Sequence, residues 1–204
     1  YYEGCGGFLE GLLSIRQSRT GLKDYLKELY PLDRGTANYI VALIDSYLAT
    51  HEQLYLDRAG EVLKRTISYQ DDIESRKLHD VESCWFYVVL LQAAGRFIDL
   101  KGTLGQLDNS FHSVKLSLVK YAEYMLQNEY PYLQKPEILE FPNHTWTGQD
   151  LRKAVVFAYA SMFATSGMEK YQEKAWEFYY YVVHTLSKQP STSYTRIQAL
   201  LMLN

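Results

Sequence analysis

The chain has few cysteines, no excess of basic residues and no long apolar run, and each shortage excludes a class of protein. Two cysteines in 204 residues are too few for a disulfide-rich scaffold or a four-cysteine zinc site. A formal net charge of -3 leaves no basic stripe, so we expect no nucleic-acid partner. The longest apolar runs, such as residues 85–91, are much shorter than a membrane span.

Motifs that would bind a metal ion or a phosphate are also missing. The five histidines show no metal-ligand spacing such as HExxH, and the glycines near position 5 lack the strand that precedes a dinucleotide-binding loop. We therefore predict no metal and no cofactor. Cys5 and Cys84 have no motif around them, so both are expected to be free thiols without a nucleophilic role.

The chain does contain long stretches with helical periodicity. None of its five prolines lies between positions 32 and 130, and proline inside a helix costs about 3 kcal/mol. Apolar residues recur at helical spacing over 40–48, 54–67, 111–126 and 171–183, and no segment alternates as a strand does. The sequence therefore predicts an all-α protein with a single domain over 1–204.

Two segments, 85–91 and 154–160, are apolar on every side, and a helix without a polar face must be covered all round. Buried and amphipathic helices alternate along the chain, which predicts two concentric layers. Inner helices are expected over about 5–19, 36–50, 80–97, 147–165 and 191–204. Outer helices are expected over about 22–30, 53–70, 110–128 and 168–187.

The turns between these helices resemble one another. Gly21 precedes Tyr25 by four residues, and Gly167 precedes Tyr171 in the same way. Two intervals between expected inner-helix starts are also equal, from 36 to 80 and from 147 to 191. These regularities favour stacked αα-hairpins. Ordinary antiparallel helix packing is the alternative, because glycine and tyrosine are common near turns.

Repeated αα-hairpins with apolar inner helices resemble the α/α-toroid superfamily, which includes the six-hairpin glycosidases. The segment Asn143-His-Thr-Trp-Thr-Gly-Gln-Asp-Leu-Arg152 is similar to a pattern in uncharacterised toroid proteins of bacterial exopolysaccharide clusters. The resemblance implies a partial (α/α) toroid, a polysaccharide or oligosaccharide ligand, and a place in the bacterial cytoplasm or periplasm. A ring of six hairpins needs more helices than the nine expected, so we expect an open ring or a fragment of a longer toroid.

In such a ring the inner helices begin at one end, where free N–H groups and helix dipoles suit polar ligands. Aromatic rings there could pack on the C–H face of a sugar while polar groups bind its hydroxyls. The loop over 130–146, with three prolines, is the expected centre of the site. The predicted sugar-binding residues are Asp80, Glu82, Trp85, Asn143, His144, Trp146, Gln149, Arg152, Tyr194 and Arg196.

A glycosidase needs two carboxylates that flank the scissile bond. Asp150 and Glu140 are the predicted catalytic pair, with Asp80 or Glu82 as substitutes. Asp80 is equally suited to the N-cap of a helix that starts at Val81.

Several of the same residues have an ordinary structural explanation. Thr147 and Asp150 fit a capping box, in which Asp150 would only cap a helix. Trp85 and Trp146 fit a buried core, and His144 could be a hydrogen-bonded structural residue.

Two other functions are consistent with these features. A lyase or epimerase would use His144 or Tyr194 as proton carriers instead of a pair of carboxylates. A non-catalytic helical-repeat scaffold for protein–protein interaction would use the concave face of the stacked hairpins. The scaffold predicts no paired carboxylates in a pocket, and it predicts an exposed apolar or aromatic patch.

Overall fold

The structure is a computed structural model that describes residues 30–188 and 195–202, and these residues form helices and no β-strand. The helices are α3 (Arg34–Thr50), α4 (Gln53–Thr66), α5 (Val81–Cys84), α6 (Tyr87–Thr103), α7 (Asn109–Asn128), α8 (His144–Phe163), α9 (Met168–Ser187) and α10 (Thr195–Met202). Short 3-10 turns lie at Glu74–Arg76, Tyr132–Gln134 and Pro136–Ile138. The all-α prediction is confirmed for this part of the chain. The helices expected over 5–19 and 22–30 lie outside it, apart from Tyr30, which precedes α3.

Side-chain caps explain where three of the long helices begin. A carboxylate oxygen of Asp33 accepts a hydrogen bond from the N–H of Thr36 at 2.7 Å, and Asp108 caps α7 through the N–H of Phe111 at 3.0 Å. Asn143 caps α8 through the N–H of Thr145 at 2.9 Å. Each cap pairs a backbone donor that the first turn leaves without an intrahelical partner.

The inner helix expected over 80–97 is interrupted. The short α5 ends at Cys84, and α6 begins at Tyr87, because the bonds from Val88 N–H to Trp85 O and from Val89 N–H to Phe86 O span three residues. Such bonds tighten the turn relative to an α-helix. The prediction of one continuous helix here was therefore wrong.

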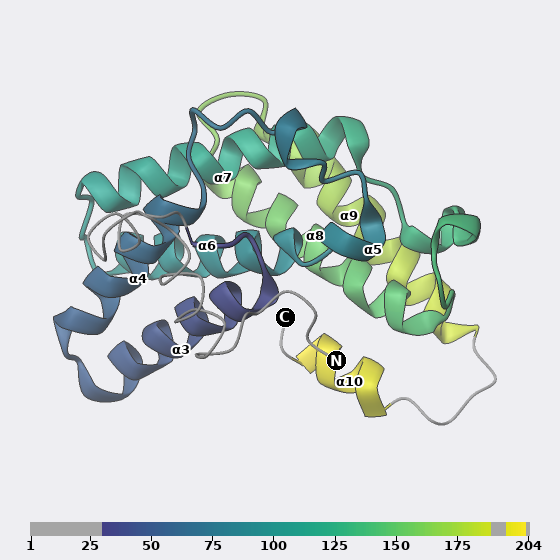
Figure 1. Cartoon of the computed structure of the whole chain (residues 1–204), viewed down its shortest axis with the longest axis horizontal. Helices are drawn as coiled ribbons and strands as arrows, with labels where there is room; N and C mark the ends of the chain where they lie inside the picture. Colours follow the sequence, from purple (N-terminus) through teal and green to yellow (C-terminus); the bar gives the residue numbers. More distant parts are fainter. Residues whose placement is uncertain (1–29, 189–194, 203–204) are drawn as a thin grey trace, which may run out of the picture.

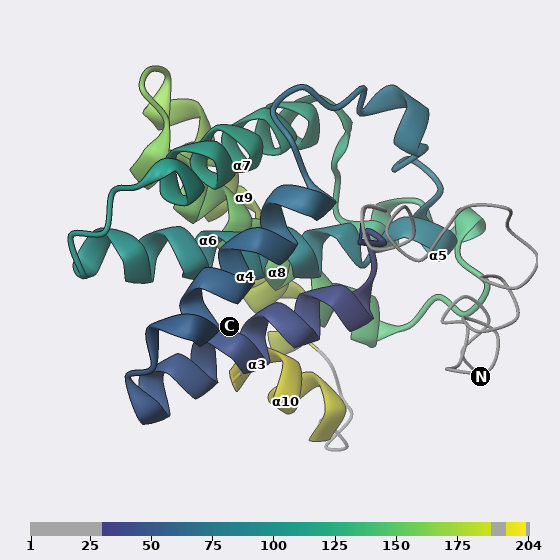
Figure 2. The ribbon, with the colours of Figure 1, turned by 60° about the vertical axis from the view of Figure 1, so that its left-hand side comes forward.

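Consecutive helices pack as pairs, and the pairs pack on one another. α3 contacts α4, α6 contacts α7, and α8 contacts α9, while α3, α6, α8 and α10 contact one another in that order. Figures 1 and 2 show this arrangement, and in Figure 2 α6 and α8 lie between α7 and α9 on one side and α3 and α10 on the other. Residues at the starts of α5, α8 and α10 lie around one hollow together with Phe141 of the loop before α8.

The two segments predicted to be covered on every side differ in their outcome. In the first segment, Trp85 and Phe86 are half-buried and every residue from Tyr87 to Leu91 is buried, which confirms the expectation there. In α8, Ala158 is exposed and the side chain of Met162 is 60% exposed, so the expectation is wrong for this helix. The flank stays open because α10 packs on the start of α8, where Leu200 lies against Gly148. This exposed flank counts against a ring that closes over α8.

The approach of α6 to α8 depends on the absence of a side chain at Gly95. A Cβ atom placed there would lie 2.1 Å from Cδ2 of Tyr159, closer than real atoms pack. We predict that Gly95→Ala lowers the free energy of unfolding by about 1–3 kcal/mol, the usual cost of overpacking. Urea unfolding followed by circular dichroism measures it.

The matched control is Gly102→Ala in the same helix, where the nearest atom would be 3.8 Å away. Because alanine is about 1 kcal/mol better than glycine inside a helix, this variant should be neutral or more stable. Equal effects of the two substitutions would contradict the contact between Gly95 and Tyr159.

Candidate functional site

A shallow pocket lies where α5, the start of α8 and α10 meet. Its volume is 180 Å³. We call it the mouth pocket, and it is lined by Glu82, Trp85, Phe141, Asn143, Thr145, Trp146, Gln149 and Arg196. Six of the ten predicted binding residues are therefore together. Phe141 and Thr145 were missed, although both lie in or beside the loop that the sequence singled out.

Three aromatic rings pack together beside this pocket, and two of them, Trp85 and Trp146, line it. The rings of Trp85 and Trp146 have centroids 6.1 Å apart at an interplanar angle of 81°, and Tyr132 packs on Trp146 at 5.0 Å. The indole N–H of Trp146 donates a hydrogen bond to the carbonyl oxygen of Phe141 at 3.2 Å. Both indoles are half-buried. The edge-to-face packing and this bond fix the orientation of the rings.

The polar side chains of this region are held by neighbours. A carboxylate oxygen of Glu82 accepts the N–H of Glu140 at 2.6 Å, which ties α5 to the loop before α8. The side-chain oxygen of Gln149 accepts a bond from Nε of Arg152 at 2.9 Å, while Nη1 of Arg152 bonds the side chain of Gln92 at 2.6 Å. Burial lowers the pKa of Arg152, and the charge of Arg34 lowers it further. Arg152 therefore positions Gln149 and does not itself line the pocket.

The start of α8 differs from the predicted capping box. The cap is Asn143, and Thr147 lies in the second turn of the helix, so the box formed by Thr147 and Asp150 was wrong. Among the described residues, Oγ1 of Thr147 and Nδ1 of His144 are buried and have no hydrogen-bond partner. His144 begins α8 beside the mouth pocket but does not line it.

The structure does not bring the predicted catalytic pair together in a pocket. Asp150 is fully buried, and Oδ1 lies 3.0 Å from Nζ of Lys153. Lys153 also lies 2.7 Å from a carboxylate oxygen of Glu129 and donates to the carbonyl oxygen of Tyr130 at 2.6 Å. Glu140 is exposed and does not line the mouth pocket. A role of Asp150 in catalysis stays a prediction that its burial does not favour.

This buried cluster holds two carboxylates and one ammonium. Burial raises the pKa of Asp150 to about 7, although Lys153 and the backbone N–H of Tyr132, which donates at 3.2 Å, act in the opposite direction. The hydroxyl of Tyr87 donates to Glu129, and burial raises the pKa of Tyr87 well above its ordinary value. The pair Asp150 and Lys153, three residues apart on a helix, was the one sequence signal for the cluster.

The remaining predicted residues lie apart from the pocket. Asp80 precedes α5 and is exposed, but its side chain makes no capping hydrogen bond. Cys84 is a free thiol, and burial raises its pKa. Tyr194 and Cys5 lie outside the described residues.

No group of three or more histidine, cysteine, aspartate and glutamate side chains in residues 30–188 and 195–202 is arranged to hold a metal ion. In the same part of the chain, no helix combines the length and the apolar character needed to cross a membrane. No protein-family model matches the sequence, and neither does any curated protein or solved structure.

The raised pKa of Asp150 makes a prediction about stability and pH. The carboxyl group binds its proton more tightly in the folded chain, with a pKa of about 7, than in the unfolded chain, where it is about 3.9. Between these values only the folded form keeps the proton, so stability falls as the pH rises from about 4 to 7. Asp150→Asn cannot titrate. The difference in free energy of unfolding between wild type and variant should fall over this range by a few kcal/mol, on the order of 1.4 per pKa unit.

Urea titrations at a series of pH values measure that difference, and titrating groups outside the cluster of Asp150, Lys153 and Glu129 cancel between the two proteins. A difference that stays flat or rises with pH would mean that Lys153 keeps the pKa of Asp150 low despite burial.

Proposed function

We propose that the protein binds a carbohydrate group in the mouth pocket. The observation that carries the proposal is the combination of two half-buried indoles, one carboxylate, two amides and one guanidinium around a single hollow. A pyranose ring presents C–H groups that pack on aromatic rings and hydroxyls that both donate and accept hydrogen bonds. Glu82 accepts, Arg196 donates, and the amide N–H groups of Asn143 and Gln149 can donate, while their oxygens already accept from Thr145 and Arg152.

The size of the pocket limits the ligand. Its volume of 180 Å³ is below the range of about 300–1,000 Å³ that is common for ligand pockets. We infer that it takes one sugar ring, or one ring of a longer chain that continues across the surface. Phe141 and Arg196 are exposed at its edge and are in position to contact a neighbouring ring.

Binding without hydrolysis is the form of the proposal that the geometry supports. A glycosidase needs two carboxylates facing one bond, about 5–5.5 Å apart for retention and about 6.5–9.5 Å apart for inversion. Among the described residues that line the mouth pocket, Glu82 is the one carboxylate. Its neighbour Glu140 contributes a backbone N–H, and Asp150 is paired with Lys153.

We further propose that the stacked hairpins form part of an (α/α) toroid with two layers. The support is the packing order, in which α3, α6, α8 and α10 follow one another and α4, α7 and α9 do the same. The mouth pocket lies at the starts of α5, α8 and α10, where such an arrangement would collect the N-termini of inner helices.

A glycan array followed by calorimetry on the positive glycans tests the proposal. Arg196→Ala alters an exposed side chain, and Glu82→Gln keeps an oxygen that can accept the N–H of Glu140, so both variants should fold. Because a hydrogen bond to a charged group contributes about 1.5–3 kcal/mol, each should weaken binding by about tenfold or more.

Glu173→Gln on α9 is the matched control, with the same change of an exposed glutamate outside the pocket. It should leave the affinity unchanged. The proposal fails if no glycan binds, or if the control and Glu82→Gln weaken binding equally. If the wild-type protein releases reducing ends from a glycan and Glu82→Gln abolishes that release, the function is hydrolysis and not binding alone.

A further inference from the structure

A second and larger hollow of 650 Å³ lies between α8 and α9, away from the mouth pocket. We call it the α8/α9 groove. Its lining is almost wholly apolar and includes Val155, Ala158 and Met162 of α8 and Ala175, Trp176 and Tyr179 of α9. The apolar surface continues past the groove along α9, where Tyr180 is 63% exposed and Val183 is 47% exposed. Exposed apolar and aromatic side chains that are contiguous in this way are typical of binding surfaces.

The aromatic residues of this surface hold one another in place. Trp176 stacks on Tyr180 with ring centroids 5.5 Å apart, and Tyr179 packs edge-on against Trp176 at 5.6 Å. Tryptophan and tyrosine dominate the binding energy of protein interfaces, since they bury much area and lose little conformational entropy. The trio is ordered before any partner arrives.

The chain itself shows what such a groove accepts. The preceding pair, α6 and α7, has its own groove, and α8 contacts both helices. Tyr159 of α8 lies against Gly95 of α6, and Phe163, four residues later, packs on Phe111 of α7 with centroids 6.3 Å apart. One helix with large side chains four residues apart thus fills the α6/α7 groove. The α8/α9 groove is the next in this series, with the small Ala158 on its floor and α10 packed on the start of α8 alone.

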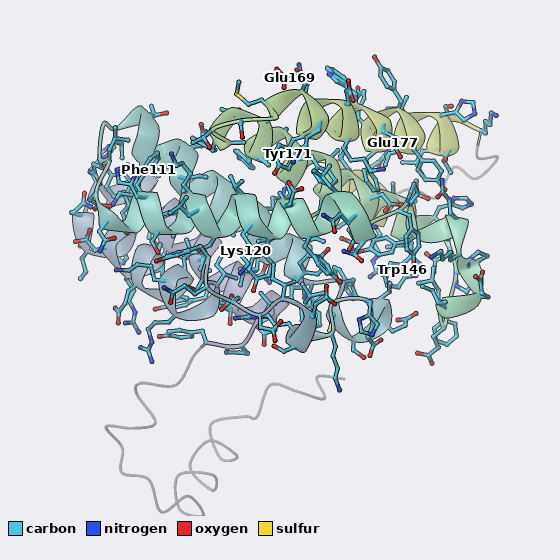
Figure 3. The ribbon with its side chains drawn as sticks, turned by 90° about the horizontal axis from the view of Figure 1, so that it is seen from above. Phe111, Lys120, Trp146, Glu169, Tyr171 and Glu177 are labelled. Atoms are coloured by element: carbon cyan, nitrogen blue, oxygen red, sulfur yellow. The ribbon has the colours of Figure 1, made fainter. Side chains whose placement is uncertain are left out.

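The charge beside the groove narrows the choice of partner. Glu169, Glu173 and Glu177 are spaced by four along α9, so they form one exposed acidic row. Figure 3 shows Glu169 on the outer side of α9, while Tyr171 points toward α7. Glu177 pairs with Lys174 at 2.8 Å, and no described cation pairs with Glu169 or Glu173. The row disfavours a membrane with anionic lipids, and in a second copy it would add a second set of negative charges.

We propose that the α8/α9 groove docks an amphipathic helix of another protein. The partner helix has large apolar side chains at positions i and i+4, as Tyr159 and Phe163 are in the α6/α7 groove, and lysine or arginine along one flank. In helix-in-groove binding of this kind, the apolar stripe of the helix provides affinity, and the flanking charges provide orientation and specificity.

A phage-displayed library of 20-residue helices, randomised on one face, tests the proposal with the full chain as bait. The helices expected to be enriched carry apolar residues at i and i+4 and basic residues beside them. Ala158→Trp fills the groove from an exposed position and should weaken each enriched helix by about tenfold or more, the effect of losing a central anchor. Glu169→Lys combined with Glu173→Lys should shift selection toward acidic flanks.

Ala49→Trp, at an exposed alanine on α3, is the matched control and should leave binding unchanged. Melting temperatures of all variants verify that they fold. The proposal is overturned if no helix is enriched, if the enriched helices bind Ala158→Trp as well as wild type, or if their flanks show no bias toward basic residues. Dimers that form with rising concentration and disappear in Ala158→Trp would assign the groove to a second copy instead.

Discussion

The rest of the fold is built around the burial of α6. Every residue from Tyr87 to Leu91 is buried, and α3, α4, α7 and α8 supply the neighbours, while Gln92, Arg96 and Asp99 form a narrow polar stripe that is partly exposed. Near the end of the helix, the buried ammonium of Lys101 is bound by Asp108 at 2.6 Å and by Ser110 at 2.9 Å. Burial acts to raise the pKa of Asp108, but the bonds from Lys101 and Ser110 lower it below its ordinary value. The core helix and the cap of α7 are thereby linked.

Periodicity and chain punctuation were sufficient to predict most helices. α3, α4, α7 and α9 begin within two residues of the expected positions, because each combines an apolar stripe with a turn. The interruption at Trp85 and Phe86 was not predictable, since both residues continue the apolar pattern without a proline or glycine between them. The open flank of α8 was missed for a related reason. An apolar helix surface predicts that the helix should be buried, but it does not predict which segment, if any, packs on it.

The location of the candidate site was predictable from the sequence, but the environment of its ionisable groups was not. The expectation that helix starts lie at one end placed Glu82, Trp146 and Arg196 together, and these residues line one pocket although they come from three different helices. Asp150 is on the same helix, yet it faces the interior. Its environment is set by Lys153, by Glu129 at the end of α7 and by the backbone of Tyr132, and such tertiary partners leave no pattern near Asp150 in the sequence.

The three tryptophans of the chain divide between the two proposed surfaces, with Trp85 and Trp146 at the mouth pocket and Trp176 at the α8/α9 groove. Indole emission shifts in colour and intensity when water around the ring is displaced. The native fluorescence of this chain therefore reports occupancy at both surfaces without any added label. Phenylalanine in place of Trp176 would leave a signal from the mouth pocket alone, so that comparison with the wild type would separate the contributions of the two surfaces.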